Sequence, residues 1–235
     1  MQINPAHAID APPLHSGDRL SRAEFARRYA AHPEIKRAEL IAGVVYVASP
    51  VRFTQHGKPH SDIVTWLGLY RAATPGVTGA DNTTVLLEFE TEVQPDALLR
   101  LEPEQGGRSR VTADDYIDGP PELLVEVAAS SAAYDLHDKR QVYARNGVQE
   151  YLVLQIYEQR VDWFILREGV YTSLAPDADG ILRSAIFPGL WFDPAAFWRD
   201  DLAALLGVVQ RGIATAAHAA FVARLRGARL PDEDV

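Results

Sequence analysis

The chain alternates between segments of helical and of strand periodicity. Apolar residues recur at helical spacing after the capping sequence Ser21-Arg22-Ala23-Glu24, and again from His60 to Arg71. The stretch 38–47 holds two β-rich runs around Ala42-Gly43, which predicts a hairpin. Further strands are predicted from short apolar runs over the ranges 83–89, 92–99, 122–128, 150–156, 161–166, 170–174 and 187–192.

Helices return later in the chain. One is predicted over 135–146, with Gly147 placed where a left-handed C-terminal cap belongs. The C-terminal part is apolar at helical spacing, which predicts helices over 194–206 and 208–225 with a break at Gly207. The polar stretch 100–119 predicts a mobile loop.

These elements divide the chain into three parts. Residues 1–17 are rich in proline and glycine without periodicity, which indicates a flexible or draped N-terminal arm. Residues 18–195 mix strands with helices and form one α/β (α+β) domain, and residues 196–235 form a C-terminal helical extension. The last helix is expected to serve packing or dimerisation rather than ligand binding.

Composition narrows the functional classes. The chain has 235 residues, of which 47% are hydrophobic and 23% charged, as in soluble globular proteins. No apolar run approaches the roughly 18 residues that span a bilayer, and no signal peptide is recognisable, so we expect a cytoplasmic protein. The absence of cysteine leaves oxygen and imidazole as metal ligands. A net charge of -9 argues against coating of nucleic acid by bulk electrostatics.

Glu126 is the unusual residue in this pattern. It lies inside Leu123-Leu124-Val125-Glu126-Val127-Ala128, a run typical of a strand covered on both faces, where a carboxylate needs a compensating cation, metal or donor. Asp96 follows Pro95 on a neighbouring predicted strand. Two such carboxylates either share a hard divalent cation or act as general acid and general base. Lys139, thirteen residues after Glu126, favours phosphoryl transfer over sugar hydrolysis.

The order of these residues resembles the PD-(D/E)xK nuclease superfamily. Its pattern is a Pro-Asp pair, here Pro95-Asp96, followed later in the chain by Glu-x-Lys. Here position 128 is alanine, and the lysine lies on the following helix. This placement of the lysine is similar to that in the Uma family of restriction-endonuclease-like proteins. The chain also resembles that family in Glu39 of the hairpin, His60 at a helix start, the sequence from Asp135 to Tyr151, and Pro188-Gly189-Leu190. The resemblance covers roughly residues 20 to 195.

The resemblance implies a fold and a site. The fold would be a restriction-endonuclease-like mixed β-sheet flanked by helices. Asp96 and Glu126 would bind Mg²⁺ or Mn²⁺ with the Val127 carbonyl as third ligand. Lys139 would activate or position the attacking water, and Glu39 would complete the acidic cluster. Each acid also has a purely structural alternative: an edge or turn residue for Asp96, a buried ion pair with Lys139 for Glu126, and a cross-strand partner of lysine or arginine for Glu39.

Further residues are candidates for supporting roles. His60 is a candidate contact to phosphate or to a metal-bound water, or else a helix cap, and Tyr143 is placed to hydrogen-bond the site or to bury its ring. Basic residues in the two polar loops are candidates for contacts to DNA phosphates, namely Arg52, Lys58, Arg100, Arg108 and Arg110.

The leading hypothesis is therefore a Mg²⁺- or Mn²⁺-dependent DNA endonuclease, expected by analogy to act as a homodimer because scission of both strands needs two sites. An inactive nuclease-fold scaffold or nucleic-acid-binding module is the alternative, favoured by the net acidity and the alanine at position 128. A sugar hydrolase ranks last, because the tryptophans occupy positions typical of core.

Overall fold

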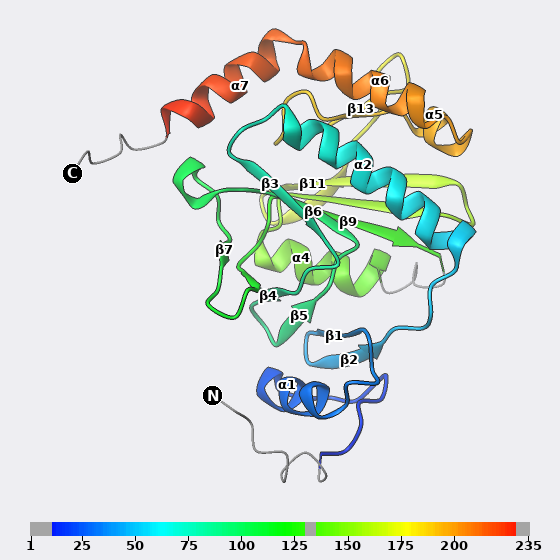
Figure 1. Ribbon diagram of the computed structural model, residues 1–235, viewed down its shortest axis with the longest axis vertical. Coiled ribbons are helices and arrows are strands. Elements are labelled where there is room, and N and C mark those ends of the chain that lie inside the picture. Colours follow the sequence, from blue (N-terminus) through cyan, green and yellow to red (C-terminus); the bar gives the residue numbers. More distant parts are fainter. Residues whose placement is uncertain (1–10, 130–134, 229–235) are drawn as a thin grey trace, which may run out of the picture.

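A six-stranded sheet forms the centre of the computed structural model, which describes residues 11–129 and 135–228 (Figure 1). The strand order is β12-β11-β10-β9-β6-β3. Strands β9 and β10 are parallel, and the other neighbouring pairs of this sheet are antiparallel. The strands are β3 (Val77–Asp81), β6 (Ala97–Leu101), β9 (Leu123–Ala128), β10 (Glu150–Gln155), β11 (Arg160–Arg167) and β12 (Val170–Ser173).

Both faces of this sheet are covered, as the dense apolar runs predict. Helix α2 (Lys58–Ala72) lies on one face and helix α4 (Arg140–Asn146) on the other (Figure 1). Odd-numbered positions of β9 belong to the hydrophobic cluster that contains α2, and even-numbered apolar positions to the cluster that contains α4. Because strand side chains alternate, Glu126 faces α4. The parallel pair β9 and β10 is joined through α4, which is the usual βαβ crossover.

A second six-stranded sheet lies beyond α4, in the order β2-β1-β5-β4-β8-β7. Its strands are β1 (Ala38–Ile41), β2 (Val44–Val47), β4 (Val85–Leu87), β5 (Thr91–Val93), β7 (Arg110–Val111) and β8 (Ile117–Asp118). Strands β1 and β2 form the predicted hairpin. Pairing of Leu40 with Glu92 sets this hairpin beside the segment that leads into β6. Glu39 is thereby brought towards the central sheet.

Helix α1 (Arg22–Ala31) begins as its capping sequence predicts, since the Ser21 side chain accepts from the Glu24 N–H at 3.3 Å. The part of the N-terminal arm that is described, residues 11–17, packs against the hairpin. Leu14 is 4% exposed, and the Gly17 N–H donates to the Val45 carbonyl at 2.8 Å. Residues 1–10 lie outside the described part of the chain.

The C-terminal region is helical, but its breaks differ from the prediction. It contains α5 (Pro194–Trp198), α6 (Leu202–Ile213) and α7 (Ala216–Gly227). The predicted break at Gly207 is wrong, because this residue lies inside α6. Helices start instead at Asp201 and Thr215, whose side chains accept from backbone N–H groups three residues on. Among the described residues no single helix is long and apolar enough to cross a membrane, although the bent pair α6 and α7 meets that criterion together.

Three other elements differ from the sequence-based expectation. The range 92–99 is two strands, β5 and β6, in different sheets, because the chain turns at Gln94-Pro95. Strand β3 was not predicted. The range 100–119 was expected to be one mobile loop, yet it holds the end of β6, a 3-10 turn η3 (Pro103–Gln105) and the pair β7 and β8. A short pair, β13 (Leu182–Arg183) and β14 (Trp191–Phe192), completes the fold.

Candidate functional site

Asp96 and Glu126 lie opposite each other on neighbouring strands. Ala97 of β6 pairs with Val125 of β9 in an antiparallel register, and continuing this register by one residue sets Asp96 against Glu126. The Val127 N–H donates to Asp96 Oδ2 at 2.7 Å. Each of the two carboxylate residues is 2% exposed. The structure thus brings together the two acids that the sequence singled out.

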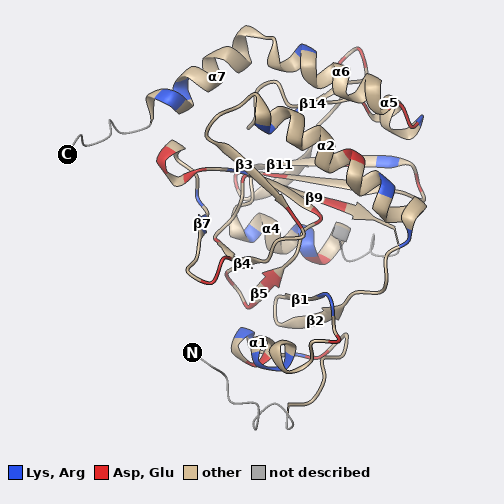
Figure 2. Cartoon of the chain, in the orientation of Figure 1, with Lys and Arg blue, Asp and Glu red and all other residues tan. Residues whose placement is uncertain are grey.

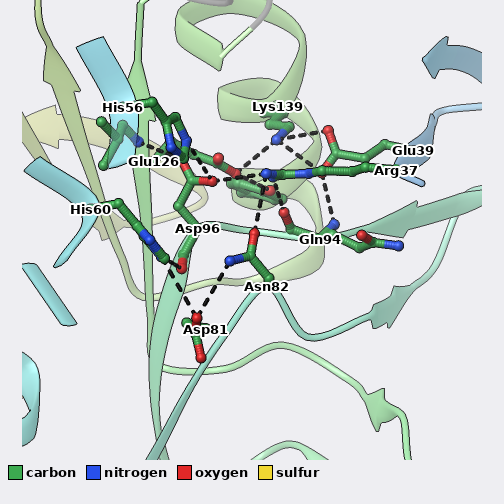
Figure 3. Close-up of polar contacts among 12 residues, drawn as sticks. Arg37, Glu39, His56, His60, Asp81, Asn82, Gln94, Asp96, Glu126 and Lys139 are labelled. Carbon is green, nitrogen blue, oxygen red and sulfur yellow. Dashed lines mark hydrogen bonds and ion pairs between the residues drawn. The ribbon is translucent and has the colours of Figure 1, made fainter. Parts of the chain in front are cut away.

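Lys139 reaches this pair from the helix side. It ends a π-helical turn, η4 (Asp135–Lys139), that runs directly into α4. Its Nζ lies 2.8 Å from Glu126 Oε1 and 2.9 Å from Glu39 Oε2, and the side chain is 1% exposed (Figure 3). Tyr143, one helical turn later, donates its hydroxyl to Glu126 Oε1 at 3.2 Å. Lysine, tyrosine and two carboxylates therefore form one buried cluster.

Glu39 enters the cluster from the hairpin. It lies on β1, is 4% exposed, and its Oε1 accepts the backbone N–H of Gln94 at 2.7 Å. The carboxylate thus bridges the second sheet, the Lys139 ammonium and the chain segment just before Asp96. A buried glutamate with these two contacts helps to fix how the hairpin sits over the central sheet.

Asp96 is also held by two basic side chains. Arg37 Nη1 lies 3.0 Å and His56 Nε2 lies 3.1 Å from the same oxygen, Oδ1. Burial by itself raises the pKa of the Asp96 carboxyl. The hydrogen bond from His56 and the charge of Arg37 outweigh this effect, so the pKa lies well below the ordinary range of aspartate. Asp96 is therefore ionised in the folded protein.

Arg37 is the second cation of the site. Besides Asp96 it contacts the Asn82 side-chain oxygen at 3.2 Å and the Gln94 carbonyl, and it lies 4.0 Å from Glu39 (Figure 3). Burial lowers the pKa of the guanidinium, but the surrounding carboxylates raise it above its ordinary value. Arg37 consequently keeps its positive charge at any accessible pH.

His60 contacts the backbone of Asp96 and also lies near the Asp81 carboxylate. Its Nε2 lies 2.8 Å from the Asp96 carbonyl oxygen and 3.9 Å from Asp81 Oδ2. His56 lies one helical turn earlier, in the π-helical turn η2 (Phe53–Gly57) that precedes α2, and the two rings are 5.6 Å apart. The two histidines therefore hold Asp96 by its side chain and by its main chain.

A pocket of about 580 Å³ opens onto the cluster. The charged groups of the cluster line it together with His56 and Val127. Of these charged side chains, Arg37 is the most exposed, at 22%. Residues further out belong to the 48–52 loop and to the β10–β11 turn, and they include Val51, Arg52 and Tyr157. A ligand that enters the pocket therefore finds acidic and basic side chains next to one another.

Of the basic residues proposed to contact DNA, Arg52 lies at this pocket and is exposed. Lys58 does not line the pocket. It begins α2, where its ammonium pairs with Asp62 at 3.2 Å and with Asp200. Lys58 therefore ties α2 to the turn between α5 and α6.

The other three arginines are not brought to the pocket. Arg100 is 4% exposed, and its guanidinium is hydrogen-bonded to neighbouring protein groups. Arg108 donates to the Gly147 carbonyl, and Arg110 pairs with Asp118 at 2.6 Å. Basic and acidic residues are interspersed over the described parts of the chain (Figure 2). The structure thus assigns these arginines contacts within the fold.

Arg37 and His56 were not among the predicted site residues. Arg37 stands two positions before Glu39, so in an extended chain both side chains share a face. His56 stands four positions before His60, which places the two on one side of a helix. Either spacing could have indicated the residue, but only after its partner had been assigned to the site.

The residues present fit a divalent cation in ligand type and in charge. Carboxylate and carbonyl oxygens are the ligands that Mg²⁺ and Mn²⁺ prefer. Within residues 11–129 and 135–228, no three His, Asp or Glu side chains are grouped so that they could hold a metal ion. Basic groups contact Asp96 Oδ1 and Glu126 Oε1 instead. Three carboxylates nevertheless face two side chains of formal positive charge, Arg37 and Lys139, with His56 beside Asp96.

Comparison with known proteins agrees with this geometry. The sequence model of the Uma2 family, described as "Putative restriction endonuclease", matches residues 22–195. The chain belongs to this family. The Uma2 match begins at the first residue of α1 and ends inside α5, so it contains the whole site cluster and leaves out α6 and α7. The predicted family is thus confirmed.

A solved structure has the same fold. It is described as a "putative nuclease belonging to DUF820" from Anabaena variabilis ATCC 29413, and it aligns with a TM-score of 0.53 at 12% sequence identity. The alignment covers 81% of this Uma2 chain and 99% of that chain. The likeness confirms the predicted nuclease-like mixed α/β fold. No curated protein matches the chain.

Proposed function

We propose that this Uma2 protein is a Mg²⁺- or Mn²⁺-dependent endonuclease that hydrolyses phosphodiester bonds of DNA. The observation that carries the proposal is the arrangement of Asp96 and Glu126 on facing strand positions with the Lys139 ammonium 2.8 Å from Glu126. Two carboxylates with an adjacent lysine suit phosphoryl transfer, where charge on the phosphate must be offset and water must be oriented.

The proposed ligands of the ion are Asp96, Glu126 and the Val127 carbonyl. A bound Mg²⁺ or Mn²⁺ supplies Lewis acidity, which offsets charge on the phosphate and makes water a stronger acid. All of these residues line the pocket, so a phosphate group that enters it reaches them.

The chain's own residues hold the reacting groups in place. The Lys139 Nζ fixes the Glu126 carboxylate and keeps a positive charge beside it, and we propose that it also orients the attacking water. Glu39 and Tyr143 hold Lys139 and Glu126 in this geometry. His60 holds the Asp96 main chain, so the aspartate cannot move with the preceding turn. Such preorganisation is the main contribution that a protein makes to phosphoryl transfer.

The test is a plasmid assay with matched aspartate variants. Purified protein with Mg²⁺ is expected to nick supercoiled plasmid, and Asp96→Ala is expected to reduce the rate by about 100-fold or more, as removal of a preorganised charged group does. Asp179→Ala, at an exposed turn that does not line the pocket, should nick like the wild type. Equal nicking by the Asp96 variant would mean that the activity comes from a contaminant.

One observation favours the alternative of an inactive scaffold or nucleic-acid-binding module. The site carboxylates are already paired with Arg37, His56 and Lys139, so the fold does not need an ion to be stable. Calorimetric titration with Mn²⁺ separates the two functions. An active site binds Mn²⁺ and loses this binding with Glu126→Gln, whereas a scaffold shows no such heat in either protein.

Assembly and location are further parts of the proposal. Cutting both strands of a duplex takes two sites, so we expect a homodimer, which sedimentation equilibrium would detect as twice the chain mass. The absence of cysteine is consistent with a cytoplasmic protein.

A further inference from the structure

The charges that line the pocket do not balance. Glu39, Asp96 and Glu126 contribute three formal negative charges, and Arg37 and Lys139 contribute two formal positive charges. These five groups therefore leave one negative charge, and His56, which also contacts Asp96, is positive only when it is protonated. Arg52 lies exposed at the mouth, where solvent screens it. A buried cluster is stable only when its charge is nearly neutral, so this deficit limits what the pocket takes up.

One divalent cation with one phosphodiester group leaves this cluster closer to neutrality than two cations with the same group do. One divalent cation turns the single negative charge into a single positive charge, and two cations leave three positive charges. A phosphodiester group carries one negative charge. One cation with one phosphodiester group therefore gives zero, while two cations with the same group leave two positive charges buried.

Arg37 is the cation that can contact this phosphodiester. The Lys139 side chain is 1% exposed and is enclosed by two carboxylates, whereas the Arg37 side chain is 22% exposed and lines the pocket. Its planar guanidinium has the geometry to donate two parallel hydrogen bonds to phosphate oxygens. It now occupies Asp96 Oδ1, an oxygen of a proposed metal ligand.

We propose that the pocket binds one divalent cation together with one phosphodiester group, and that Arg37 moves from Asp96 to the phosphodiester when both are present. The inference rests on the proposed nuclease function and deepens it in two respects. It fixes the number of cations per chain, and it assigns the phosphate contact to a residue outside the predicted site. Without nucleic acid, Arg37 then competes with the cation for Asp96. When nucleic acid is bound, Arg37 contacts the phosphodiester instead.

The first experiment is calorimetric titration with Mn²⁺ alone. Wild-type protein is expected to bind one Mn²⁺ per chain. Arg37→Gln should bind it at least about 10-fold more tightly, because a positive charge in contact with Asp96 is lost. Arg37→Lys keeps the charge and should stay within about 3-fold of the wild type. Arg183→Gln, which removes a guanidinium paired with Asp177 elsewhere on the surface, is the matched control.

The second experiment measures strand binding in Mn²⁺ by fluorescence anisotropy. The probe is a short all-phosphorothioate oligodeoxynucleotide, which keeps one negative charge per linkage, and the comparison probe has uncharged methylphosphonate linkages. Arg37→Gln should bind the charged strand at least about 10-fold more weakly, the loss expected for hydrogen bonds to a charged group. Arg37→Lys should also bind it more weakly, because an ammonium cannot make the paired contact.

Arg37→Gln is expected to raise the affinity for Mn²⁺ and to lower the affinity for the charged strand. A misfolded Arg37→Gln protein would instead lose affinity for both ligands, so the two experiments distinguish this role from damage to the fold. Two Mn²⁺ per wild-type chain would overturn the inference, as would unchanged or weaker Mn²⁺ binding by folded Arg37→Gln. Those results leave the proposed nuclease intact. Absence of Mn²⁺ binding by the wild type would instead overturn the proposed function itself.

Discussion

Lys139 joins the parts of the site, because its ammonium is buried between carboxylates from two different sheets. Glu39 comes from the hairpin sheet and Glu126 from the central sheet, and both lie within 3 Å of Nζ. Burying an ion pair is not stabilising in itself, but breaking one leaves an uncompensated charge in the interior. The same lysine therefore serves stability and the proposed chemistry.

Lys139→Met should cost about 3–5 kcal/mol of unfolding free energy at pH 7, since two buried carboxylates lose their ammonium. Urea unfolding followed by circular dichroism measures this loss. Lys58→Met is the control, because that side chain is 38% exposed and its ion pairs are near solvent. Its cost should stay within about 1 kcal/mol. Equal losses for the two variants would show that the Lys139 pairs contribute little.

The two acids and the lysine of the site could be predicted from the sequence, whereas the basic partners of Asp96 could not. A glutamate inside an apolar strand cannot be explained by solvation, so Glu126 and then Asp96 and Lys139 stand out. The structure brings all three together. Arg37 and His56 lie in polar segments where charged residues are common, so nothing local separates them from solvated residues. Their proximity to Asp96 depends on tertiary structure.

Two π-helical turns deliver basic residues to the site. Turn η2 carries His56 and runs into α2, and turn η4 ends at Lys139 and runs into α4. A π-helical turn rotates its side chains relative to the regular helix that follows, and such turns are often found at functional sites. The i to i+5 hydrogen bonds of a π-helical turn cannot be predicted from any pattern of residue types in the sequence. The sequence therefore predicted both helices but not the exact direction of these two side chains.

The strands show where periodicity alone is insufficient. The single strand predicted over 92–99 divides into β5 and β6, which enter different sheets. Gln94-Pro95 accounts for this, because proline cannot donate to a strand ladder. Strand β3 was missed because Gly79 and Thr78 give its sequence little apolar character. It lies at the edge of the sheet, where less burial is needed.

Helix α6 contains two glycines in opposite environments, which gives an internal comparison. A Cβ at Gly212 would lie 2.1 Å from the Gly189 carbonyl oxygen, whereas nothing lies within 4 Å of a Cβ at Gly207. Gly212→Ala should lower the unfolding free energy by about 1–3 kcal/mol through overpacking. Gly207→Ala should raise it by about 0.5–1 kcal/mol through helix propensity. Thermal unfolding of both variants measures the difference.

If the unfolding free energy rose in both glycine variants, α6 would be able to shift away from Gly189 at no cost. The expected loss would instead show that α6 is held firmly against the Pro188-Gly189-Leu190 turn. That turn also accepts the Tyr70 hydroxyl at the Pro188 carbonyl, so it links α6 with α2.

At the scale of the whole molecule, the C-terminal helices and the domain matched by the Uma2 family share one core. Leu205 and Val209 of α6 and Phe221 of α7 belong to the cluster that also contains Trp66 and Tyr70 of α2. The Uma2 match ends at residue 195, before these helices. They nevertheless cover the face of α2, and α2 follows directly after His56. The extension thus supports the site through packing.

Two buried acids change the pH dependence of global stability in opposite directions, because folding lowers the pKa of one and raises the pKa of the other. The folded-state pKa of Asp96 is depressed, so its contribution is present above the unfolded pKa of about 3.9 and is lost as the pH falls through the folded value. Glu150 behaves in the other direction. Burial raises its pKa to about 7, although hydrogen bonds from Ser184, Ala185 and Ile186 oppose the shift.

Glu150 therefore predicts a stability that falls as the pH rises. Between its unfolded pKa of about 4.3 and its folded pKa of about 7, the native state binds a proton that the unfolded state has released, so unfolding free energy decreases with pH. The total loss is about 4 kcal/mol at about 1.4 kcal/mol per pKa unit. Glu150→Gln cannot ionise, so its urea unfolding should be less pH-dependent between pH 5 and pH 7. The exposed Glu158→Gln should keep the wild-type profile. Parallel profiles for all three proteins would show that Glu150 stays ionised in the fold, with its hydroxyl and N–H donors outweighing burial.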